Sequence, residues 1–406
     1  MTGVPHSEML PAMTTAQFLR DGCTVIEPGE LGWDAARRAF NLAVDQRPAL
    51  IALPLDEQDI VAAVRTANEL GLRVVAQAMG HRARRSGALS DAMLLRTTAL
   101  ADVEIDVRAH RARVRAGARW ADVYDRASFM GLAPSGGFVR GAGVVGDVLG
   151  DGMGWLARRH GVAARGVLAV EFVTRDGDVV RSECLEDAHG AVITALEIAL
   201  HPADDLYAGA LFFSHERAAE VLHAWREWTA TAPAAITSVA RVMRFPDRHD
   251  IPELVRGRSY TIIEAAHLGT EAEGTELLEP LRALRAELDT FSLVPPSALS
   301  HLHMESEHPE PRLADDGLVG ELPAAAIDDL LAVAGPGSQS PLATVELRHA
   351  SGALETLERG FFTHAAGIPS SPGSAAAIEA QLALVAGALA PYGAVAVQAW
   401  ALPGVA

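Results

Sequence analysis

Apolar residues in the first half of the chain recur with two different periods. A short apolar run at residues 49–53, closed by Pro54, predicts a strand, and the helical spacing of apolar residues over 56–70 predicts a helix that ends at Gly71. Residues 73–77 then predict a second strand. A strand, a helix and a strand in this order indicate a βαβ unit, whose ligand site lies at the carboxyl end of the second strand.

The next segments favour antiparallel pairing. Two hairpins are predicted, residues 103–106 with 111–116 and residues 168–174 with 179–182, the second turning at Asp176-Gly177. A helix is expected over 120–131, a glycine-rich stretch over 136–154 and a last strand over 191–200. Pro202 marks a boundary.

After Pro202 the pattern changes to strands at 236–245, 259–266 and 343–349 between helices at 216–231 and 270–288. This predicts an α+β region with an antiparallel sheet and helices on one face. A loop is expected at 294–313, and a helix at 375–390 precedes a strand-like 394–397. We therefore expect a lead-in at 1–47 with a helix at 33–44, domains at 48–203 and 204–370, and a C-terminal helix and strand at 371–406.

Composition limits the functional classes. The 406 residues carry a net charge of −18, which argues against nucleic acid or an anionic membrane as partner. No apolar run is long enough to span a bilayer and no signal pattern begins the chain, so a cytoplasmic protein is expected. Cys23 and Cys184 have no metal or disulfide spacing. The chain contains no lysine, which excludes a Schiff-base mechanism.

The loop after the second strand, residues 78–81, ends in Gly80-His81. Glycine lets backbone N–H groups approach a phosphate closely, whereas Ala78 and Met79 bring side chains to that place.

Several ordered motifs carry a resemblance to a known family. They are Gly80-His81, the run Gly117-Ala118-Arg119-Trp120, the run Gly150-Asp151-Gly152-Met153-Gly154, and Arg47-Pro48. With them, the chain resembles the berberine-bridge-enzyme-like oxidases of the vanillyl-alcohol-oxidase (PCMH-type) flavoprotein superfamily. The resemblance implies an FAD-binding domain of two α/β lobes plus a substrate domain with an antiparallel sheet and helices on one face. It also implies that His81, Gly80, Gly150 and Gly152 bind the cofactor, with His81 linked covalently to the flavin.

The same resemblance shows departures from the family pattern. Val139 stands where some members have a second flavin-linked cysteine, and Asp151 would set a carboxylate against phosphate groups. The family's glycine-rich segment that wraps the cofactor is missing between 184 and 191, and its C-terminal segment is missing after Ala406. We therefore expect a protein that has lost FAD and uses no cofactor, with retained FAD as the alternative. His81 would then be a relic stacked on Arg82, Arg84 or Arg85, although these arginines could instead hold a diphosphate.

Relatives of this family include polyketide cyclases, so the resemblance implies a redox-neutral cyclase of [4+2] type acting in a cavity between the domains. The alternatives are an FAD-dependent oxidase of a natural product and a non-catalytic polyketide-binding protein. The expected partner is a small polyketide-like molecule, with no nucleic acid and no membrane; a homodimer is left open.

Polar residues on the predicted second-domain strands are the candidate catalytic groups. The strand period of two places Glu346 and Arg348 on one face. The alternative to a catalytic role is that these two residues form a plain surface or interface ion pair. The full candidate set is Glu346, Arg348, His349, Tyr260 and Glu264. The spacing in residues 301–305 could bind a metal, but too few ligands accompany it, so no metal is expected.

Overall fold

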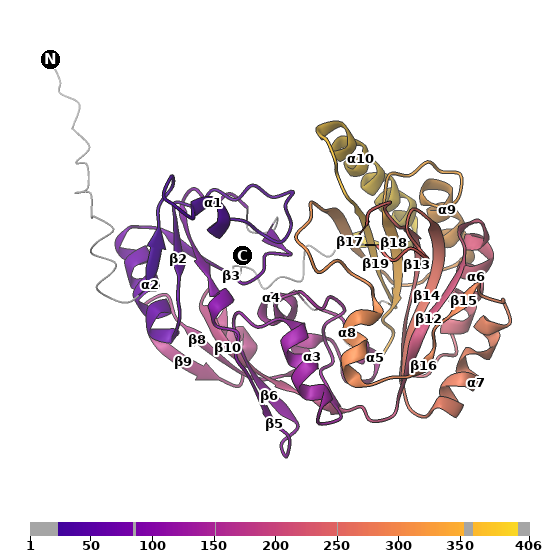
Figure 1. Cartoon of the computed structure of the whole chain (residues 1–406), viewed down its shortest axis with the longest axis horizontal. Coiled ribbons are helices and arrows are strands. Elements are labelled where there is room, and N and C mark those ends of the chain that lie inside the picture. The colour runs from indigo at the N-terminus through magenta and orange to yellow at the C-terminus, as the bar shows by residue number, and fades with distance from the viewer. Residues whose placement is uncertain (1–22, 84–86, 151, 250, 353–359, 397–406) are drawn as a thin grey trace.

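The computed structural model describes residues 23–83, 87–150, 152–249, 251–352 and 360–396. The chain forms an N-terminal domain of two lobes and a C-terminal domain built on one large sheet, side by side (Figure 1).

The first lobe contains the predicted βαβ unit. Helix α2 (Glu57–Glu69) begins at Asp56, whose carboxylate accepts a hydrogen bond of 3.0 Å from the Asp59 N–H. The strands lie in the order β1-β2-β4-β3 and are β1 (Thr24–Ile26), β2 (Leu50–Leu53), β4 (Ala92–Arg96) and β3 (Arg73–Gln77). Strands β2 and β3 are both parallel to β4, which lies between them.

The helix predicted over 33–44 is wrong beyond its first turn. Helix α1 covers only Trp33–Ala36, because the following backbone bonds elsewhere: the Phe40 N–H donates to the Met79 carbonyl at 2.8 Å and the Leu42 N–H to the Glu310 carbonyl at 3.1 Å. The lead-in therefore contacts both the first lobe and the C-terminal domain.

The second lobe is an antiparallel sheet, and both predicted hairpins are confirmed. Its strands, in the order β5-β6-β10-β8-β9, are Val103–Asp106, Arg111–Arg115, Val192–Ala199, Val167–Val173 and Val179–Ser182. Three helices accompany it: α3 (Trp120–Ser128), α4 (Val144–Val148) and α5 (Ala157–His160). A small ladder of β7 (Leu132–Ala133) and β11 (His201–Pro202) leads to the next domain.

The C-terminal domain is the predicted α+β unit. Its nine-stranded sheet has the order β15-β12-β14-β13-β18-β19-β17-β20, with β16 beside β12. The strands are β12 (Leu206–Ser214), β13 (Ile236–Arg244), β14 (Ser259–Leu268), β15 (Leu288–Asp289), β16 (Ser292–Leu293), β17 (Leu313–Val319), β18 (Thr344–His349), β19 (Phe361–Gly367) and β20 (Val395–Ala396). The helices are α6 (Ala218–Thr229), α7 (Glu271–Arg282), α8 (Leu299–Leu302), α9 (Ala324–Ala334) and α10 (Pro372–Leu389).

One face of this sheet is apolar and the other is partly charged. Alternate residues such as Leu211, Ile263 and Leu347 pack under α6, α7, α9 and α10. By length and composition, residues 372–392 could also cross a membrane, but Ile378, Leu382, Val385 and Leu389 of α10 pack in this core. The opposite face carries the polar side chains and lies toward the N-terminal domain (Figure 1).

Candidate functional site

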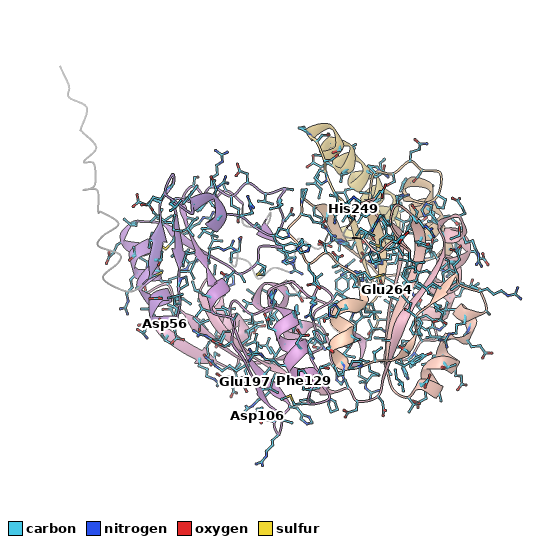
Figure 2. The ribbon with its side chains drawn as sticks, viewed as in Figure 1. Asp56, Asp106, Phe129, Glu197, His249 and Glu264 are labelled. Carbon is cyan, nitrogen blue, oxygen red and sulfur yellow. The ribbon has the colours of Figure 1, made fainter. Side chains whose placement is uncertain are left out.

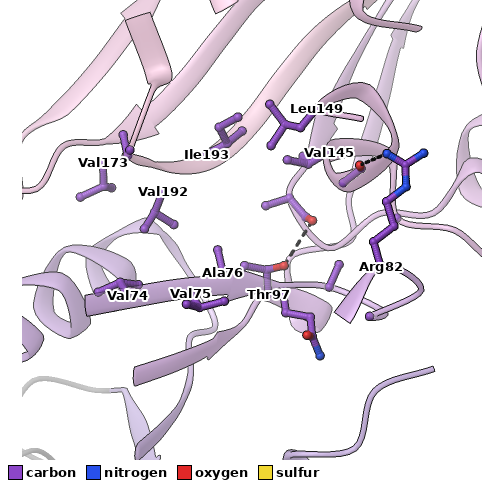
Figure 3. Close-up of a pocket in the computed structure, with 18 of the residues that line it drawn as sticks. Val74, Val75, Ala76, Arg82, Thr97, Val145, Leu149, Val173, Val192 and Ile193 are labelled. Atoms are coloured by element: carbon purple, nitrogen blue, oxygen red, sulfur yellow. Dashed lines mark hydrogen bonds between the residues drawn. The ribbon is translucent and has the colours of Figure 1, made fainter. Parts of the chain in front are cut away.

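A cavity of about 590 Å³ lies inside the N-terminal domain, between its two lobes. Figure 3 shows Val74 and Ala76 of β3 on one wall and Val173, Val192 and Ile193 of the second lobe on the other. Its volume falls in the range of sites for small organic ligands. The aliphatic walls suit a flat, weakly polar group such as a nucleobase.

The loop after β3 lines this cavity and leaves backbone donors unpaired. The N–H groups of Met79, Gly80, His81 and Arg82 donate to no acceptor within the described residues. Gly80 has a φ of 85°, which favours glycine. Adjacent backbone N–H groups without acceptors can bind an anion.

The His81 side chain lies in the same loop. Its ring is stacked on Phe40 with centroids 3.8 Å apart, and both ring nitrogens are buried without a hydrogen-bond partner in the described structure. Burial lowers the pKa of His81 to about 4, so the imidazole is neutral at neutral pH and its nitrogen lone pair is available. The predicted stacking on Arg82 is wrong, and Arg84 and Arg85 lie outside the described residues.

Arg82 stands at one end of the cavity (Figure 3). Its guanidinium is 3.4 Å from both the Gly146 carbonyl and the Asp147 carboxylate, which are long contacts. Asp147 accepts a shorter bond of 2.8 Å from Trp120 Nε1, and burial raises the pKa of its carboxyl group. Arg82 is therefore weakly neutralised and suited to an anionic ligand.

The two predicted cofactor glycines after Arg82 have different positions. Gly150 lines the cavity, and a Cβ there would collide with the Arg82 guanidinium. Gly152 does not line the cavity; a Cβ there would meet the Asp147 carboxylate. Gly152 therefore makes room for a side chain rather than for a ligand. Asp151 lies outside the described residues.

Three of the predicted catalytic residues meet in a buried charged network. Glu264 bonds Arg241 at 2.5 Å and His303 at 2.7 Å, while Glu346 bonds His303 at 3.2 Å and Arg348 at 2.7 Å. The side chains of Glu264, Glu346 and His303 have no solvent exposure, and Glu264 is labelled within the C-terminal domain in Figure 2.

Each charge in this network has a partner. Burial alone would raise the pKa of Glu346, but the charges of His303 and Arg348 hold it well below its usual value. Burial opposes protonation of His303, yet Glu346 and Glu264 raise its pKa. The charged groups of the network are bonded to one another, so neither carboxylate is free to meet a substrate in this arrangement. That Glu264 and Glu346 act catalytically stays a prediction.

The same network could offer a metal three ligands. Atoms of His303, Glu305 and Glu346 lie within 4.8 Å of one another. However, Glu305 bonds Arg312 at 2.8 Å and Glu346 bonds Arg348, so arginines already neutralise both carboxylates. This arrangement does not favour a cation.

Tyr260 and His349 are separated from the other candidates. Tyr260 packs in an apolar cluster with Phe212 and Phe245. His349 points to the other side of its strand, where its ring lies 5.5 Å from that of Phe361 and burial lowers its pKa to about 3. The prediction that these two residues share the site with Glu346 is therefore wrong. Arg241 and His303, which complete the network, were not predicted.

Comparison with known proteins places the cavity in context. The FAD binding domain family matches residues 48–183. This segment contains the His81 loop and the cavity-lining residues up to Arg175. (R)-6-hydroxynicotine oxidase of Paenarthrobacter nicotinovorans is 30% identical over 188 residues, covering 44% of this chain and 41% of that protein. Glucooligosaccharide oxidase of Sarocladium strictum is 31% identical over 166 residues, covering 39% of this chain and 32% of that protein. The aligned chain thus spans less than half the length of these relatives.

The fold extends the likeness to both domains. The solved structure of berberine-bridge-enzyme-like 1 from Physcomitrella patens superposes with a TM-score of 0.76 at 17% identity, covering 92% of this chain and 88% of that one. The fold and the matched domain are those of PCMH-type FAD oxidases. They support the expected resemblance to the berberine-bridge-enzyme-like proteins of the vanillyl-alcohol-oxidase superfamily.

Proposed function

We propose that the protein is an FAD-linked oxidoreductase of a small organic molecule, with FAD held between the two lobes of the N-terminal domain. One observation carries the proposal: an edge of the cavity whose polar groups lack partners among the described residues. It consists of four loop N–H groups, both His81 nitrogens and a weakly neutralised Arg82, all beside an aliphatic slot. Relatives named as oxidases support the same class.

The described residues fit this cofactor. The loop N–H groups and Arg82 would bind the diphosphate, and the slot between Val74 and Val192 would hold the adenine. His81, neutral and with free nitrogens, would be the attachment point of the flavin. FAD supplies a hydride acceptor. The expectation of a protein without a cofactor has no support in these comparisons.

The expected redox-neutral cyclase is the less favoured reading. Such an enzyme needs an apolar chamber between the domains, where it would hold a reactive conformer. The described cavity lies instead inside the N-terminal domain, and the sheet face toward that domain carries the charged network of Glu264, His303 and Glu346. We therefore do not propose cyclisation.

The test is flavin content and reduction. Protein purified with added FAD is expected to be yellow and to stay yellow after acid precipitation, whereas His81→Asn keeps only flavin that acid releases. The yellow protein is then mixed anaerobically with (R)-6-hydroxynicotine, benzyl alcohol or maltotriose, and bleaching of the flavin absorbance is followed. Protein that takes up no FAD would overturn the proposal.

A further inference from the structure

A row of polar side chains crosses the sheet face that lies toward the N-terminal domain. The strand register pairs Arg241 with Glu346, Glu346 with His364, and His364 with Asp316, across β13, β18, β19 and β17. Directly paired residues point to the same face, so these four side chains form one line.

Exposure rises along this line. Arg241 and Glu346 are sealed, with side-chain exposures of 1% and 0%, whereas His364 keeps 13% and Asp316 keeps 41%. The line therefore opens to solvent at its β17 end. A substrate that enters between the domains would meet His364 and Asp316 before the buried network.

The open end is a histidine–carboxylate pair. His364 Nδ1 lies 2.7 Å from Asp316 Oδ1, while its Nε2 has no hydrogen-bond partner among the described residues. The charged groups that face it are Asp316 on β17 and Glu346 and Arg348 on β18. Asp316 fixes the ring and the tautomer with the proton on Nδ1, which leaves Nε2 as an acceptor.

This pair is linked along the chain to the segment that contacts His81. Residue Arg312, directly before β17, exchanges two hydrogen bonds with Asn41 at 2.9 and 3.0 Å, and the neighbouring Phe40 is stacked on His81. Asp316 follows four residues further along the strand, roughly 13 Å from Arg312 at the rise of an extended chain. The strand that carries Asp316 therefore continues from a segment bonded to the neighbour of Phe40, which packs on His81.

We propose that His364 is the catalytic base of the reaction and that Asp316 is its positioning residue. This inference rests on the proposed function. His364 Nε2 would take the proton of a substrate O–H or N–H group while the adjoining C–H bond gives up its electron pair as hydride and a C=O or C=N bond forms. FAD, when bound, would supply the hydride acceptor, and an external acceptor such as molecular oxygen would take up the electrons.

The first experiment follows anaerobic flavin reduction by the three probes named above in wild type, His364→Gln and Asp316→Asn. His223→Gln is the matched control, because His223 makes a similar 2.9 Å pair with Asp328 on the helix-covered side. We expect His364→Gln to slow reduction about 100-fold or more, Asp316→Asn to slow it about 10-fold, and the control to match wild type. Unchanged FAD content, thermal unfolding and dithionite reduction exclude a folding defect. Wild-type rates in His364→Gln would overturn the proposal.

The second experiment needs no substrate. Diethyl pyrocarbonate modifies imidazole nitrogens that solvent reaches, and mass spectrometry locates the product. We expect His364 to react in the FAD-loaded protein, more slowly than His223 and faster than the sealed His303. An unreactive His364 would overturn the base assignment even where no probe reduces the flavin, whereas failure to bind FAD would overturn the proposed function instead.

Discussion

The cavity of the N-terminal domain and the charged network of the C-terminal domain contrast in how their polar atoms are satisfied. The cavity leaves His81 and four loop N–H groups without partners in the described structure. The network buries Glu264, Glu346 and His303 completely, yet each of them is bonded to an opposite charge.

This difference separates ligand sites from structural ones. A buried polar group without a partner is costly and indicates a missing ligand, whereas a fully paired group has nothing left to offer one. A search for clustered charged side chains would have selected the network of the C-terminal domain, and not the cavity, as the ligand site. Unpaired ring nitrogens beside a cavity select the His81 loop; those of His267 also lack hydrogen-bond partners in the described structure but do not line that cavity.

The largest effect on stability is expected from removing a carboxylate of the charged network. Glu346→Ala leaves Arg348 and His303 buried without their shared carboxylate, and we expect a loss of about 3–5 kcal/mol in the free energy of unfolding, measured in urea. Glu305→Ala, at the more exposed margin of the network, is the matched control and should cost less. Equal small losses in both would show that Glu346 is not a partner of buried charges.

A smaller effect is expected at the cavity, and on binding rather than stability. Arg82→Ala should weaken FAD and ADP binding by about 1.5–3 kcal/mol, roughly 10- to 100-fold, and leave riboflavin binding unchanged, since only the first two carry a diphosphate. Calorimetry measures all three. Arg73→Ala is the control: it lines the same cavity but is tied to Asp91 at 3.1 Å. Equal losses in both variants would contradict a local phosphate contact.

Acid should reduce stability in two successive pH windows. Because burial lowers the pKa of His81 from 6.5 to about 4, the unfolded chain binds more protons there, and stability falls as pH drops from 6.5 toward 4. Burial raises the pKa of the Glu305 carboxyl group, but the charge of Arg312 outweighs burial and lowers the pKa to about 2. The contribution of Glu305 to the free energy of unfolding is therefore lost only below about pH 4.5. In urea titrations, His81→Asn should reduce the loss of stability in the upper window without abolishing it, because buried His349 contributes there too. A change confined to the lower window would contradict the assignment.

Much of the fold could be predicted because its patterns are local. The hairpins, α2 and the loop that ends in Gly80-His81 follow from short periods and turn residues. Strand β12 was not predicted, because the run Leu206–Ser214 is buried on both faces and does not alternate.

The site was less predictable because it depends on contacts between distant segments. The period of two correctly paired Glu346 with Arg348, but it could not show that Arg241 and His303 would seal them. Likewise, nothing near His81 in the sequence indicates that Phe40 stacks on it. The sequence shows that the loop at residues 78–81 lacks most of the family's glycines. It could not show that Arg82, rather than Arg84 or Arg85, lines the cavity.

The most direct measurement of the account is the FAD stoichiometry of wild type and of Ala76→Trp. Ala76 lines the cavity on β3 with its side chain outside the core (Figure 3), so an indole there fills the slot without displacing buried packing. We expect one FAD per chain in wild type and none in Ala76→Trp, with similar thermal unfolding of both apoproteins. Equal FAD binding by the two proteins would contradict the cavity as the cofactor site.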